Sequence, residues 1–140
     1  MGLIMLIWYQ FTETEFILYG ALTYLVLSQL LKRLIPRAHR RGMASVKAED
    51  YHNAITHFQN SYDFFNKNDW IDRYRYLTLL SSTKMSYREM ALNNMAFCYG
   101  QIGDGQTAKA YYERTLAEYP ESGMAKAGLR LLNSMAAEHE

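Results

Sequence analysis

Residues 89–122 contain the feature that most constrains the fold, two amphipathic stripes separated by a glycine-rich break. Side chains at three- and four-residue intervals share one face of a helix. Such intervals join Leu92, Met95, Ala96 and Tyr99 in the first stripe, and Ala108, Tyr112, Thr115 and Leu116 in the second. Gly103 can adopt the left-handed conformation that ends a helix, and Pro120 closes the second stripe. The pattern predicts two paired helices that approach closely at alanine.

This spacing resembles the signature of the tetratricopeptide repeat (TPR) family, W-x2-L-G-x2-Y, then A-x3-F, then a closing proline. The matching positions here are Leu92, Met95, Ala96, Tyr99, Ala108, Tyr112 and Pro120. Thr115 departs from the family, which usually has alanine at that position. The resemblance implies an all-α fold of TPR-like helix–turn–helix repeats. In particular, the chain resembles small bacterial single-pass, membrane-anchored TPR proteins of unassigned function.

A weaker copy of the pattern lies upstream and predicts a second helix pair. Gly42, Ser45, Ala54, Phe58 and Ser61 recur at the offsets of Ala96, Tyr99, Ala108, Tyr112 and Thr115. We therefore expect a helical domain over 36–140, with repeat one at 37–68 and repeat two at 89–122. Between them lies an insert, 69–88, too apolar to be a bare linker, and a capping helix is expected over 122–138. Ser86 and Glu89 form a capping box that starts repeat two.

The N-terminal segment, residues 1–35, is far more apolar than the rest of the chain. Residues 16–31 carry no formal charge, and about 20 residues of helix span the hydrocarbon core of a bilayer, so a transmembrane helix is predicted at 16–35. A block of basic residues flanks it: Lys32, Arg33, Arg37, Arg40 and Arg41. By the positive-inside rule, the N-terminus would lie outside and the TPR domain in the cytoplasm, as in a bacterial inner membrane. Alternatively, the segment packs on the repeats or mediates dimerisation.

The resemblance also implies a binding surface, because the first helix of each TPR lines a concave groove that receives a peptide or helix. The corresponding positions are His39, Met43, Val46 and Lys47 in repeat one, and Asn93, Phe97, Gly100 and Gln101 in repeat two. Some members bind acidic chaperone tails through a carboxylate clamp, but Met43 and Phe97 stand where the clamp needs polar donors. The alternative is that the insert or the N-terminal segment fills this groove.

No residue cluster points to catalysis, a metal or a cofactor. The four histidines lack the three- or four-residue spacing that sets two ligands on one helical face. Cys98 is the only cysteine and has no recognisable base nearby in sequence, so packing is the favoured role. Residues 42–140 hold ten Lys and Arg against twelve Asp and Glu, a poor balance for binding nucleic acid. The alternating Arg and Tyr residues at 73–76 could stack on single strands, but they equally suit a lid over the core.

These observations predict a non-enzymatic, membrane-anchored adaptor or scaffold. Its groove would bind a protein or peptide partner, and its N-terminal helix would contact membrane lipid, possible roles being assembly or quality control of membrane complexes. The alternative is a self-associating structural protein, a homo-oligomer in which the hydrophobic segment drives assembly instead of inserting into a membrane.

Overall fold

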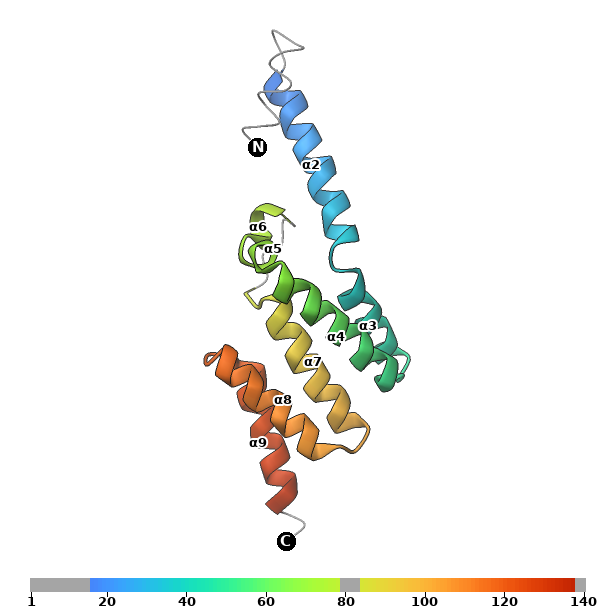
Figure 1. Cartoon of the computed structure of the whole chain (residues 1–140), viewed down its shortest axis with the longest axis vertical. Coiled ribbons are helices and arrows are strands. Elements are labelled where there is room, and N and C mark those ends of the chain that lie inside the picture. Colours follow the sequence, from blue (N-terminus) through green and yellow to red (C-terminus); the bar gives the residue numbers. More distant parts are fainter. Residues whose placement is uncertain (1–15, 79–83, 138–140) are drawn as a thin grey trace. The chain divides into compact units, whose positions relative to one another are not determined.

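The computed structural model describes residues 16–78 and 84–137, and within these ranges it is entirely helical. The helices are α2 (Phe16–Leu34), α3 (Arg37–Lys47), α4 (Tyr51–Lys67), α5 (Asp69–Arg73), α6 (Arg75–Thr78), α7 (Tyr87–Gln101), α8 (Gly105–Glu118) and α9 (Gly123–Ala137) (Figure 1). The all-α prediction is confirmed for these residues. Predictions that concern residues 1–15, Leu79, Leu80 and position 138 fall outside the described ranges.

The chain divides into two compact units, and the predicted insert is split between them. One unit holds residues 1–35 and 74–82, and the other holds 36–73 and 83–140. In the first unit, α6 packs against α2, and the hydroxyl of Tyr24 donates to the carbonyl of Leu77 at 2.8 Å. α5 belongs to the second unit, where Ile71 is buried. Residues 69–78 of the insert therefore form two short helices with different neighbours.

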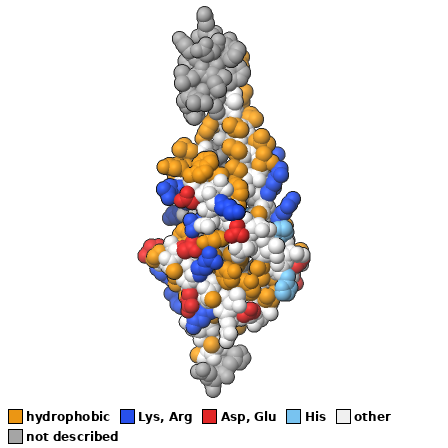
Figure 2. Space-filling model, in the orientation of Figure 1, with side chains coloured by type: hydrophobic (Ala, Val, Ile, Leu, Met, Phe, Trp, Pro, Cys, Tyr) orange, Lys and Arg blue, Asp and Glu red, His pale blue; other side chains and the backbone are white. Residues whose placement is uncertain are grey.

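Helix α2 coincides with the predicted membrane span, and its apolar side chains are largely exposed (Figure 2). Within the described ranges, however, none of the helices combines the length and apolar character that crossing a bilayer demands. The predicted single-pass span thus gains no support. The physical reason lies in the polar groups along α2, which lower its hydropathy: Tyr19, Thr23, Tyr24, Ser28, Gln29, Lys32 and Arg33.

In the second unit each long helix packs against the next one along the chain (Figure 1). The contacts join α3 to α4, α4 to α7, α7 to α8, and α8 to α9. One continuous core results, formed by Ala54, Phe58, Tyr62, Ala91, Leu92, Met95 and Cys98. Because the core side chains recur at helical spacing on α4 and α7, the amphipathic pattern decides which faces are buried.

The same turn occurs twice, once between α3 and α4 and once between α7 and α8. The Asp50 side chain accepts from the amide of Asn53 at 3.2 Å, and the Asp104 side chain accepts from that of Thr107 at 3.0 Å. The residue before each aspartate has a left-handed backbone conformation, with φ of 58° at Glu49 and 84° at Gly103. Aspartate is a preferred N-cap, because its carboxylate satisfies an amide that the helix leaves unpaired. The two turns lie 54 residues apart along the chain.

Small residues set the spacing of the paired helices. A Cβ atom built on Gly42 would lie 2.7 Å from Cε1 of Phe58, so α3 can approach α4 this closely only with glycine there. Ala96 and Ala108 are completely buried in the second pair, as the sequence predicted from their size. These contacts account for the small residues that recur in both patterns.

The start of α7 is fixed by two acceptors. Ser86 Oγ accepts from the amide of Glu89 at 3.0 Å, which is the cap that the sequence predicted. The buried carboxylate of Asp72, on α5, accepts from the amides of Tyr87 at 2.8 Å and Arg88 at 3.1 Å. The first part of the insert therefore caps the helix that follows it.

Candidate functional site

The exposed face of α7 next to α3 carries the best-formed candidate surface. Phe97 and Met43 are both predicted groove residues, and they are 42% and 40% exposed. Asn94 Nδ2 lies 3.6 Å from Met43 Sδ, which places the two helices side by side here. The Tyr51 ring, at the start of α4, meets the Phe97 ring edge-on at 6.3 Å. The structure therefore brings two predicted apolar residues onto one surface, supported by a polar and an aromatic neighbour.

His39 and Asn93 do not belong to that surface, because both are buried. The His39 ring lies edge-on to Phe58 and Tyr87, with centroids 5.4 and 5.5 Å away. Asn93 Nδ2 donates to the carbonyl of Glu89 at 3.1 Å and to Ser122 Oγ at 3.3 Å. Neither side chain can contact a partner without rearrangement. Their assignment to the groove is therefore not consistent with the structure.

The remaining predicted groove residues differ in how much of their surface is exposed to solvent. Val46 is partly buried and packs against the core. Lys47, Gly100 and Gln101 are exposed, and Gly100 also lines a cavity toward α9. Helix α3 thus contributes one apolar side chain, Met43, beside basic ones, whereas α7 contributes Phe97 beside uncharged polar ones.

Sequence reasoning missed the continuation of this face onto α9. Met124, Leu131 and Met135 are exposed there, and they lie 34 residues after Met90, Phe97 and Gln101. The inner faces correspond by the same interval, because Ala91 and Ala125 are both completely buried. The 34-residue period would have identified these positions, had it been extended beyond Pro120.

A polar cluster ties α4, α7 and α8 together elsewhere in this unit. Glu118 accepts from the Tyr62 hydroxyl at 2.8 Å and from Arg88 Nη2 at 2.8 Å, and Nε of Arg114 lies 3.3 Å from the same carboxylate. Both guanidinium groups also lie over the Tyr62 ring, at 5.6 and 4.6 Å from its centroid. Both guanidinium groups pair with the Glu118 carboxylate, so the geometry is that of a structural clamp between helices.

Cys98 has the environment of a packing residue. Its side chain is completely buried in the core, and burial raises the pKa of the thiol to about 11. The nucleophilic thiolate is therefore a minor form at neutral pH. In the described part of the chain, no group of three or more His, Cys, Asp and Glu residues has the arrangement of a metal site.

Burial lowers the pKa of His39 below its ordinary value of 6.5, against the opposing charge of Asp72. The unfolded chain therefore takes up this proton first as the pH falls. The free energy of unfolding should decrease from about pH 6.5 down to the lowered pKa of the folded state, and this step should disappear in His39→Phe. Urea titrations at several pH values would measure it, with the exposed His52→Gln as the control. An unchanged pH slope in His39→Phe would contradict the assignment.

The predicted basic block lies at the end of α2 and along α3. Lys32 and Arg33 occupy the last turn of α2, where cations favour the negative end of the helix dipole. Arg37, Arg40 and Arg41 are exposed on α3. The three arginines of α3 are thus accessible to an anionic surface, and no acidic residue interrupts α3.

Comparison of the chain with protein-family models, with curated proteins and with solved structures found no match.

Proposed function

We propose that this protein is a non-enzymatic adaptor of the TPR type that binds a partner polypeptide on the exposed face of α3, α7 and α9. In this proposal α3–α4 and α7–α8 are two repeats, and α9 covers the end of the second. Two findings support it: every long helix of the unit packs on its neighbour in sequence, and both helix pairs have the same turn. Stacked repeats bury a continuous core in this way.

The observation that carries the binding role is a row of exposed apolar residues at equivalent positions of three helices. Met43, Phe97 and Leu131 are 40%, 42% and 61% exposed. They are separated by 54 and 34 residues, the intervals that relate the turns and the buried alanines. Contiguous exposed apolar surface is unusual on monomers and often marks an interaction site. Aromatic and long aliphatic side chains at such sites supply most of the binding energy.

Membrane attachment through α2 is the second part of the proposal. Large apolar side chains are exposed along the length of the helix: Ile17, Leu18, Leu22, Leu25, Val26, Leu27 and Leu30. Two of its hydroxyls have partners within the chain, since Thr23 Oγ1 donates to the Tyr19 carbonyl at 2.8 Å and Tyr24 donates to Leu77. Internal hydrogen bonds reduce the cost of placing such groups in lipid. The flanking basic residues favour a cytoplasmic position for the domain that follows.

The exposed apolar surface of α2 also favours a second candidate function, self-association without a membrane. Water leaves the same side chains whether they meet lipid or another copy of the helix. The two functions differ in behaviour: lipid attachment requires detergent for solubility, whereas self-association produces concentration-dependent oligomers in plain buffer. Sedimentation of the full chain with and without detergent distinguishes them.

Partner binding is tested by replacing Phe97 with glutamate, since a charge in the centre of the apolar row should repel an apolar partner. In-membrane crosslinking followed by pull-down should recover much less partner with Phe97→Glu, by about tenfold or more. Phe64→Glu is the matched control, because Phe64 is 37% exposed but lies on α4. Equal recovery with both variants would remove the groove assignment.

A further inference from the structure

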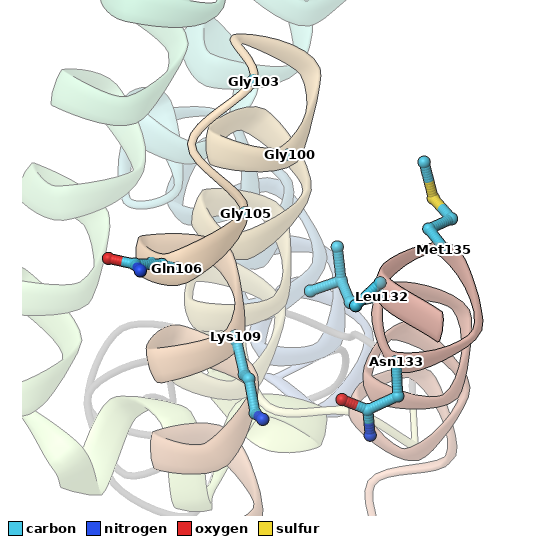
Figure 3. A pocket seen from close by; sticks show the side chains of 9 residues that line it. Gly100, Gly103, Gly105, Gln106, Lys109, Leu132, Asn133 and Met135 are labelled. Carbon is cyan, nitrogen blue, oxygen red and sulfur yellow. The ribbon is translucent and has the colours of Figure 1, made fainter. Parts of the chain in front are cut away.

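A cavity of about 480 Å³ opens between the C-terminal ends of α7 and α9, beside the start of α8. Its α9 wall is formed by Leu132, Asn133, Met135 and Ala136. Leu132 points from α9 toward the end of α7 that carries Gly100 (Figure 3). This volume lies within the usual range for sites that hold a small molecule or a large side chain.

Three glycines leave the opposite wall uncovered. A Cβ atom on Gly100 would come no closer than 4.0 Å to the Cβ of Ala108, and on Gly103 or Gly105 it would meet nothing within 4 Å. By contrast, a Cβ atom on Gly128 would lie 2.4 Å from the Tyr112 ring. The glycine at 128 is thus required by packing. Those at 100 and 105 have no packing requirement and leave space that the chain does not fill.

The lining of the cavity suits an apolar group with a negative charge beside it. Leu132, Met135 and Ala136 provide an apolar wall. Lys109 is the only charged residue among those that line the cavity, so no carboxylate faces it in the described part of the chain. A cation at the margin of an apolar site favours an anionic group on the ligand.

The cavity continues the apolar row on which the proposed function rests. Gly100 follows Phe97 by three residues on α7, and Met135 follows Leu131 by four on α9, so both steps are about one helical turn. A polypeptide that covers the row can therefore place one side chain in the cavity.

The charge on these helices matches an acidic partner. Together α3, α7 and α9 carry seven Lys and Arg residues and one acidic residue, whereas α4 and α8 carry three of each sign. Of these cations, Arg88 binds Glu118 and Lys126 binds Glu121. Among the long helices of the second unit, the excess of positive charge therefore lies on those that carry the apolar row.

We propose that this cavity is the anchor site for the partner, and that it receives one large apolar or aromatic side chain from an acidic segment, with a neighbouring carboxylate near Lys109. This inference rests on the proposed adaptor function and specifies the chemistry of the partner. The binding energy comes from burying the anchor against α9, and the lysine orients the acidic segment.

The test uses indole-3-propionate as a probe, because it combines an aromatic group with a carboxylate. Binding to the full chain in detergent is followed by the methyl NMR signals of Leu132 and Met135. Gly100→Leu should fill the cavity and lower the affinity for the probe by about tenfold or more. The melting temperature of the protein should not fall, since leucine is a better helix former than glycine. Gly123→Leu is the matched control, because a Cβ atom on Gly123 would meet nothing within 4 Å and Gly123 lies at the other end of α9.

The charge is tested with the neutral amide of the same probe. The wild type should prefer the acid, and Lys109→Ala should abolish that preference. Binding of the probe to Gly100→Leu with wild-type affinity would overturn the anchor site. A preference for the acid that survives in Lys109→Ala would overturn the role of the lysine.

Partner recovery separates this inference from the groove itself. Gly100→Leu should reduce crosslinking of the partner, as Phe97→Glu does. Loss of the partner with Phe97→Glu but full recovery with Gly100→Leu would overturn the anchor site and leave the groove standing. The reverse result would support the cavity and remove the proposed groove.

Discussion

Phe58→Ala should lower the free energy of unfolding by about 3–5 kcal/mol, the usual cost of removing a fully buried aromatic ring. The ring is completely buried, lies against the His39 ring, and covers the face of α3 at Gly42. Alanine would leave a cavity between the first two helices of the unit. Domains of this size are stable by only about 5–15 kcal/mol, so the variant should be close to unfolding at room temperature. Urea denaturation followed by far-UV circular dichroism measures the loss.

Phe64→Ala makes the same chemical change six residues further along α4 and serves as the control. Phe64 is exposed and touches the neighbouring ring of Phe65, with centroids 5.1 Å apart. Its removal should cost about 1 kcal/mol or less. If both variants lost equal stability, the core would not be centred on Phe58 as the structure places it.

The elements of the second unit were predictable because local signals agree there. Repeat one was expected at 37–68, and α3 and α4 occupy 37–47 and 51–67. Repeat two was expected at 89–122, and α7 and α8 occupy 87–101 and 105–118. Ser86 indicated where α7 begins and Gly103 indicated where it ends, because an N-cap and a left-handed residue act within one helical turn.

The accessibility of individual groove residues could not be predicted, because it depends on segments distant in sequence. His39 is covered by Tyr87, 48 positions later, and Asn93 bonds to Ser122, which precedes α9. A helical wheel of α3 does not contain Tyr87, and a helical wheel of α7 does not contain Ser122. In contrast, Phe97 remained exposed as expected, because its face of α7 has only Tyr51 beside it among the described aromatic contacts.

The division of the insert was hidden for a related reason. Its apolar composition predicted burial, yet Trp70, Tyr76 and Leu77 are exposed, and Ile71 is the only buried apolar side chain among the described residues of the insert. Composition gives the amount of apolar surface but not the unit on which a segment packs. The sequence carries no signal that Asp72 binds two amides of a helix beginning at Tyr87.

Asp72→Ala should lower the free energy of unfolding by about 2–4 kcal/mol, because it leaves the amides of Tyr87 and Arg88 without their carboxylate acceptor at a partly buried helix start. Asp72→Asn should cost less, since its carbonyl oxygen can still accept one of the bonds.

Asp69→Ala is the control on the same helix. The Asp69 carboxylate is half exposed and pairs only with the exposed Arg73 among the described ion pairs, a contact worth about 0–1 kcal/mol. Urea denaturation of the three variants gives the order, and equal losses for Asp72→Ala and Asp69→Ala would show that α5 does not hold the start of α7. Because α7 carries Phe97, the expected order would also show that the insert supports the helix on which the proposed binding surface depends.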